Sequence, residues 1–169
     1  MSRKKVKISI PPNPVKAKAK VGGAYAVDAT TLQKAEEAIV AMTPQYLDWV
    51  KQDLVDIEAA YNDLINSDKK AKEICQRIFQ ISHDMKGQGG TFGFDLITTI
   101  ADQLCQIIEN VEDLNEDELE AIRIHIEAMK LVINMKMRGT GGNEGSTVLS
   151  GLEQVLRKLL GQAPPLMKN

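Results

Sequence analysis

The chain has 169 residues, enough for one domain with a short appendage. Hydrophobic residues make up 43% of it and charged residues 26%, the balance of a globular protein that buries a core. Aromatic residues are only 4%, which argues against a β-sandwich and favours helices packed through aliphatic side chains. No apolar run approaches the roughly 18 residues that span a bilayer, and the N-terminus lacks the apolar core of a secretory signal.

The charge is unevenly distributed along the chain. The net charge is −2, yet residues 1–27 carry seven basic residues and no acidic one, while the remainder carries 14 basic and 23 acidic residues. A basic segment of this kind can contact nucleic acid, anionic lipid or the protein's own acidic body. Because the cluster has no interleaved aromatic residues, the favoured interpretation of residues 1–28 is a disordered, solvated basic leader, and nucleic acid is not expected as a partner.

The first helices are predicted directly after this leader. A short helix is expected over Thr31–Met42. A longer helix then begins with Thr43 as its N-cap and Pro44 at the first helical position, where the missing N–H of proline costs nothing. Its apolar residues recur at alternating spacings of three and four, as on one face of a helix: Leu47, Val50, Leu54, Ile57, Tyr61 and Leu64.

Two further helices follow. One is capped by Ser67 or Asp68 and runs to about Gln88, where a glycine cluster ends or loosens it. The next covers about 95–111 and shows the same helical spacing of apolar residues.

The last part of the chain is also predicted to be helical. Asn115, with a glutamate three residues later, has the pattern of a capping box and opens a helix that runs to about Arg138. A flexible Gly-rich linker over 139–145, a C-terminal helix over 146–162 and a tail over 163–169 complete the chain. Apolar residues off the main stripe of the helix before the linker could be covered by the last helix or by a second subunit: Ile124, Leu131 and Met135.

These elements predict an all-α fold. No segment alternates with period two for long enough to indicate a strand. Helices joined by short loops pack as antiparallel neighbours, so an up-down four-helix bundle is expected over about 43–138, within a bundle domain of residues 29–138. The short N-terminal helix and an extra C-terminal helix are expected to cap or flank it.

One histidine is predicted to face solvent. On a helical wheel, the buried stripe of its helix is formed by Ile74, Ile78, Ile81 and Met85, and His83 points the opposite way. The side chains expected on the same face as His83 include cations, an aromatic ring and two glycines: Lys72, Gln76, Phe79, Lys86, Gly87 and Gly90.

The glycines and the aromatic ring on this face need an explanation. A glycine inside a helix costs about 1 kcal/mol relative to alanine, so Gly87 and Gly90 are interpreted as clearance for another molecule that approaches the imidazole. Phe79 lies opposite the core stripe, and two interpretations stay open: the Thr31–Met42 helix packs on it, or a partner docks on it.

An exposed imidazole next to an ammonium group is suited to phosphoryl chemistry. Neutral imidazole is a good nucleophile, and its attack on a phosphoryl group forms a covalent phosphoramidate. Lys86, three residues after His83, can offset the charge of the phosphoryl oxygens. No neighbouring arrangement of a carboxylate with a water is evident that would hydrolyse the product, so such a site would hold a phosphoryl group.

The residues His83, Lys86, Gly87 and Gly93 have the spacing HxxKGxxxxxG, and in this the sequence resembles histidine phosphotransfer (HPt) domains over roughly residues 43–138. The resemblance implies that His83 is the phosphoacceptor, at Nε2, that Lys86 assists the phosphoryl oxygens and that Gly87 provides clearance. It implies a phosphorelay intermediate. Its partners would be response-regulator receiver domains and possibly a histidine kinase, with no membrane partner, no cofactor of its own and Mg²⁺ only on the receiver. A cytoplasmic location is expected separately, because Cys75 and Cys105 cannot form a disulfide framework.

Three other interpretations of the sequence are a metal site, an autonomous enzyme and a structural bundle. A metal site is not expected, because Cys75 and His83 cannot share a coordination shell, His125 is read as a boundary residue and the cysteines as small core or boundary residues rather than a disulfide. An autonomous enzyme is not expected, because no nucleotide-binding or nucleophile motif is present. The alternative kept open is a non-catalytic bundle that acts as a scaffold or dimerisation module.

Overall fold

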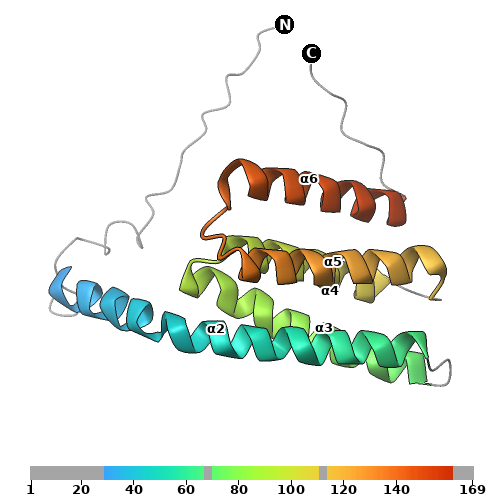
Figure 1. The fold of residues 1–169 in the computed structure, drawn as a ribbon, viewed down its shortest axis with the longest axis horizontal. Helices are drawn as coiled ribbons and strands as arrows, with labels where there is room; N and C mark the ends of the chain where they lie inside the picture. The colour runs from blue at the N-terminus through green and yellow to red at the C-terminus, as the bar shows by residue number, and fades with distance from the viewer. Residues whose placement is uncertain (1–28, 67–69, 111–113, 162–169) are drawn as a thin grey trace, which may run out of the picture. The chain divides into compact units, whose positions relative to one another are not determined.

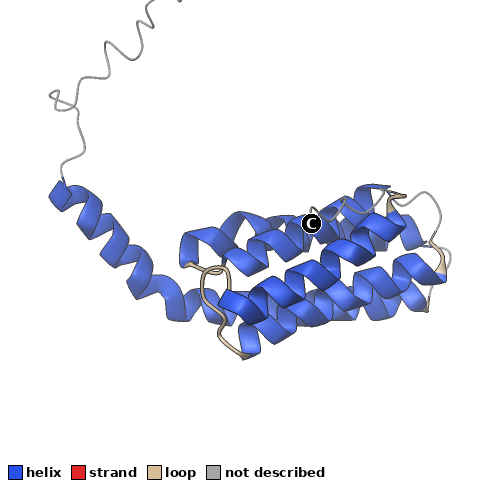
Figure 2. Cartoon of the chain, turned by 90° about the horizontal axis from the view of Figure 1, so that it is seen from above, coloured by secondary structure: helices blue, strands red, loops and turns tan. Residues whose placement is uncertain are grey.

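A computed structural model describes residues 29–66, 70–110 and 114–161. These belong to two compact units, one ending at Glu37 and the other beginning at Ala38. The predicted leader 1–28, the predicted caps Ser67 and Asp68 and the tail 163–169 lie outside the described residues. Every regular element in the described ranges is a helix, as Figure 2 shows, so the all-α prediction is confirmed.

The predicted break before Pro44 is wrong. Helix α2 is continuous over Ala29–Ile65, with Pro44 inside it. Thr43 is not an N-cap: it is 7% exposed, and its Oγ1 donates backward to the carbonyl of Ile39 at 3.5 Å. A proline removes one hydrogen bond and crowds the preceding turn, but Thr43 and Tyr46, on either side of Pro44, are buried, so tertiary packing holds this part of the helix together.

The part of α2 after Pro44 provides one wall of the core. Val50, Leu54, Ile57 and Leu64 are buried as the spacing predicted, whereas Leu47 and Tyr61 are partly buried. Sequence analysis missed two members of this face, Tyr46 and Ala60, which are also buried. The Tyr46 ring stacks on Phe92 with centroids 4.5 Å apart, which ties α2 to the segment that follows the next helix.

Helix α3 spans Ala71–Gly89 and continues into a short 3₁₀ turn, Gly90–Phe92, before α4 begins. Gly93 ends this turn with φ of +74°, in the left-handed region that favours glycine. A Cβ at Gly89 would lie 2.9 Å from the carbonyl oxygen of Phe94, so glycine there permits the close approach of α3 and α4. The glycine cluster thus ends α3, as predicted, and also lets α3 pack closely against the start of α4.

Helices α4 and α5 span Asp95–Asn110 and Glu116–Asn134. The predicted capping box is confirmed: the Asn115 side chain accepts from the backbone of Glu118, whose carboxylate accepts from the Asn115 N–H at 2.7 Å. Helix α5 ends four residues before the predicted end at Arg138. Leu131 and Met135 stay exposed and Ile124 is half-buried, so the last helix does not cover the first two.

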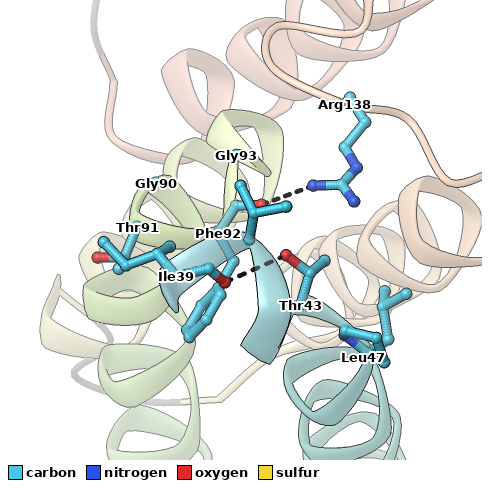
Figure 3. A pocket seen from close by; sticks show the side chains of 10 residues that line it. Ile39, Thr43, Leu47, Gly90, Thr91, Phe92, Gly93 and Arg138 are labelled. Carbon is cyan, nitrogen blue, oxygen red and sulfur yellow. Dashed lines mark hydrogen bonds between the residues drawn. The ribbon is translucent and has the colours of Figure 1, made fainter. Parts of the chain in front are cut away.

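Helix α6 spans Gly142–Leu159, so it begins inside the predicted linker 139–145. That linker is not free, because the Gly139 N–H donates to the carbonyl of Gly93 at 2.7 Å and the Gly139 carbonyl accepts from Leu96. Figure 3 shows the neighbouring Arg138, whose guanidinium donates to the Phe92 carbonyl at 2.8 Å. These bonds fix the start of α6 to the start of α4.

The helices of the larger unit form a bundle with one helix added. In Figure 1, α4 and α5 lie between α6 and the pair α2–α3, and α6 contacts both α4 and α5. Lys130 on α5 pairs with Glu58 on α2 at 2.8 Å, which links the first and last helices of the predicted four-helix bundle. None of the described helices has both the length and the hydropathy to cross a bilayer; the predicted cytoplasmic location stays a prediction.

Candidate functional site

The site is built around His83 in the middle of α3. The core face of this helix is formed by Ile78, Met85, Gly89 and Ser82, all buried. Ser82 was not predicted to be buried; its hydroxyl donates to the carbonyl of Ile78 at 2.8 Å, which satisfies it within its own helix. His83 lies away from this face with 59% of its side chain exposed, as the helical wheel predicted.

The imidazole has a neighbour on each side along the helix. The Phe79 ring, one turn earlier, is stacked against it with centroids 5.9 Å apart and planes 28° apart. The Asp84 carboxylate lies 3.7 Å from Nδ1. At this distance the two groups do not form a hydrogen bond, and attack through Nε2 stays a prediction.

Lys86 is held by the neighbouring helix. Its Nζ lies 2.6 Å from Oδ1 of Asp102 on α4, and both side chains are about two-fifths exposed, at 42% and 40%. The hydrogen bond and charge of Asp102 raise the pKa of Lys86 above its usual value. The ammonium is therefore a permanent cation, already fixed one turn from the imidazole.

His83 and Lys86 line a common hollow of about 360 Å³ between α3 and α4. The lining residues come from both helices: Phe79, Gln80, His83 and Lys86 from α3, and Asp102, Cys105 and Glu109 from α4. The hollow thus combines a nucleophile, a cation and an aromatic wall within reach of a group arriving from solvent.

The other residues predicted for the site do not line the hollow of His83. Gly87 is exposed, and a Cβ built there would meet no described atom within 4 Å beyond its chain neighbours and its own helix backbone. Gly90 lines a different hollow of about 550 Å³, together with Phe92, and Figure 3 shows it there. Lys72 and Gln76 are exposed on α3 and do not line the His83 hollow.

The structure bears on whether Phe79 is covered by the predicted 31–42 helix or is open to a partner. Phe79 is half-buried and lines the hollow of His83, whereas Ile39 and Val40, at the end of the predicted first helix, line the other hollow, against Phe92. A docking role for Phe79 stays a prediction.

His125 is a core residue and not the boundary residue predicted. It is 0% exposed, and its Nδ1 lies 2.7 Å from the carbonyl oxygen of Ala121, which accepts the ring N–H. Burial lowers the pKa of His125 below its ordinary value. The apolar sequence neighbours of His125 did not reveal this burial: Nδ1 is paired within its own helix, while Nε2 is buried without a hydrogen-bond partner among the described residues.

The cysteines are free, and Cys105 is buried as predicted while Cys75 is half-buried. Burial raises the pKa of Cys105 to about 11, which keeps its thiol neutral beside Lys86. Among the described residues, no three acidic, histidine or cysteine side chains are grouped closely enough to hold a metal ion.

Sequence analysis missed the α4 side of the hollow. Asp102, Cys105 and Glu109 are spaced three and four apart, so they share a face of α4 next to its buried stripe. That spacing is a signal, but it does not reveal which helix the face meets. Gln80 also lines the hollow but was not predicted, because it lies on the flank of the face expected to carry the site. Its amide donates to Asp84 at 3.1 Å.

Comparison with known families matches residues 41–131 to the Hpt domain, more than half of the chain, including His83 and Lys86 and excluding α6. Comparisons with curated proteins and with solved structures each found no match. Hpt domains are phosphotransfer modules of two-component signalling that interact with receiver domains and kinases and have no kinase activity of their own. The chain belongs to the Hpt domain family.

Proposed function

We propose that this protein is a phosphorelay intermediate that accepts a phosphoryl group on His83 from the aspartate of a receiver domain, or from a kinase, and passes it to another receiver aspartate. The observation that carries the proposal is the placement of an exposed imidazole next to a fixed ammonium, in a hollow open to solvent. A purely structural role for the bundle does not require an exposed imidazole next to an ammonium.

The transfer is a simple exchange of bonds. The Nε2 lone pair of His83 forms a bond to phosphorus as the P–O bond of the aspartyl phosphate breaks, and the bonding electrons return to the aspartate carboxylate. The Nδ1 proton then leaves to solvent, past the Asp84 carboxylate 3.7 Å away. Onward transfer to a second aspartate reverses these steps.

Lys86 and Gly87 have separate roles in this proposal. The Lys86 ammonium, one turn from the imidazole, compensates the charge of the phosphoryl oxygens. Gly87 leaves room one turn after His83 for the surface of the receiver. Phe79 would supply the apolar contact at the interface centre. The Mg²⁺ that receivers bind would come with the partner.

The test is phosphoryl transfer from a panel of purified receiver domains carrying radiolabelled aspartyl phosphate. We expect rapid labelling of the parent protein by at least one of them, with a label that is labile in acid and stable in base. His83→Gln should remove the label. Because His83 is exposed, this change should leave the unfolding free energy within about 0.5 kcal/mol of the parent, which a urea titration checks.

The outcome that contradicts the proposal is equally specific. The only other histidine, His125, is buried and out of reach of a partner. If His83→Gln were labelled as well as the parent, or if no receiver labelled the parent, the phosphotransfer role would be lost and the scaffold interpretation would replace it.

A further inference from the structure

The Lys86 ammonium, which is proposed to contact the phosphoryl group, already forms an ion pair with Asp102. Lys86 Nζ contacts Asp102 Oδ1 at 2.6 Å across the α3–α4 groove. The other carboxylate oxygen of Asp102 accepts a hydrogen bond from Gln106 at 3.0 Å, so the acidic side chain is itself held in place. The pair therefore joins the two walls of the hollow.

The remaining charges around His83 are mostly negative. Lys86 is the one cation among the described residues that line the hollow, whereas Asp102 and Glu109 line it as carboxylates. Asp84 adds a third carboxylate next to the imidazole. A phosphoryl group carries about two negative charges at neutral pH, so it enters a hollow whose single cation is already paired.

We propose that Asp102 is a positioning residue that competes with the phosphoryl group for Lys86 and so shifts the balance from retention on His83 toward onward transfer. This inference rests on the proposed function. Asp102 holds the ammonium across the hollow between α3 and α4. In the loaded protein, the ammonium must be shared between two anions or withdrawn from Asp102, and either change makes the loaded state less stable than it would be without that carboxylate.

The geometry limits what the ammonium can do for both partners. Lys86 is three residues after His83, so its side chain lies on the same side of α3 as the imidazole. Asp102 approaches from α4, on the opposite wall of the hollow. The ammonium has three N–H donors, and the one aimed at Asp102 is not available to a phosphoryl oxygen.

The experiment measures the equilibrium ratio of phosphohistidine to aspartyl phosphate after mixing with the receiver that exchanges fastest with the parent. Asp102→Asn keeps an oxygen that accepts from Gln106 but removes the charge. We expect it to raise the ratio about two- to fivefold, the factor that a half-exposed ion pair typically contributes. Asp102→Glu retains the charge and should behave as the parent does.

Two further variants separate this role from a general effect of charge. In a Lys86→Ala background, Asp102→Asn should change the ratio by a smaller factor than in the parent, because the competition no longer exists. Glu109→Gln removes another carboxylate of the same hollow that forms no ion pair with Lys86 in the described structure, and it should change the ratio less than Asp102→Asn does.

The outcomes divide clearly. A labelled parent with an unchanged or lowered ratio in Asp102→Asn overturns the competition while leaving the proposed function intact. An equal effect of Asp102→Asn with and without Lys86 also overturns it. A parent that no receiver labels removes the proposed function, and the inference with it.

Discussion

Substitution of Gly87 by leucine should separate stability from phosphoryl transfer. In a helix, the Cα–Cβ bond tilts toward the N-terminus, so a side chain at position 87 extends back over the residue four positions earlier, which is His83. A leucine there would lie over the imidazole without touching the core, since the space at Gly87 is open. The expected result is a folded protein in which His83 is covered.

The size of both effects follows from the structure. No described atom lies within 4 Å of a Cβ at Gly87, apart from chain neighbours and its own helix backbone, so the substitution introduces no clash. Replacing glycine in a helix by a good helix former then stabilises the protein by up to about 1 kcal/mol. Transfer should slow by about tenfold or more, since forcing a leucine into an interface contact costs about 1–3 kcal/mol.

Gly151 provides a matched control. It lies in α6, is exposed and also has open space around a built Cβ, but it is remote in sequence from α3 and outside the residues matched to the Hpt domain. Gly151→Leu should stabilise the protein to a similar extent in a urea titration and leave the transfer rate unchanged. Transfer by Gly87→Leu at the parent rate would refute the argument that glycine is there for clearance.

Four further changes test the fold around this site. Gly89→Ala should lower the unfolding free energy by about 1–3 kcal/mol in a urea titration, because its Cβ would lie 2.9 Å from the backbone of α4. Asn115→Ala should cost about 1 kcal/mol in the same assay, because the capping box is lost. Tyr46→Phe should be neutral or stabilising, because the buried Tyr46 hydroxyl has no hydrogen-bond partner among the described residues; a clear destabilisation would reveal one. Burial lowers the pKa of His125, so below its unfolded value near 6.5 the unfolded chain binds a proton that the folded protein does not, and stability falls with pH by at most about 1.4 kcal/mol per unit. His125→Leu should flatten the difference in urea midpoint between pH 7.5 and 5.5.

The helical pattern was readable because apolar spacing and capping are local properties. The stripe of α2 and the capping box at Asn115 depend on residues within one or two turns, and both are present in the structure. The errors arose where distant residues decide. Whether a helix continues through Pro44 and where the linker before α6 ends depend on packing and on hydrogen bonds such as that between Gly139 and Gly93, which no local pattern encodes.

In the candidate site, too, local features were predicted from the sequence and contacts between helices were not. The exposure of His83 follows from the phase of one helix, so the wheel predicted it. The environment of Lys86 belongs to two helices, and the sequence places Asp102 sixteen residues away with no signal that the two side chains meet. The cation predicted to offset the charge of a phosphoryl group is paired with a carboxylate of the neighbouring helix. If Asp102 competes with a phosphoryl group for Lys86, as we propose, the balance between retention and release depends on the α3–α4 contact, and exchanging Asp102 measures it directly.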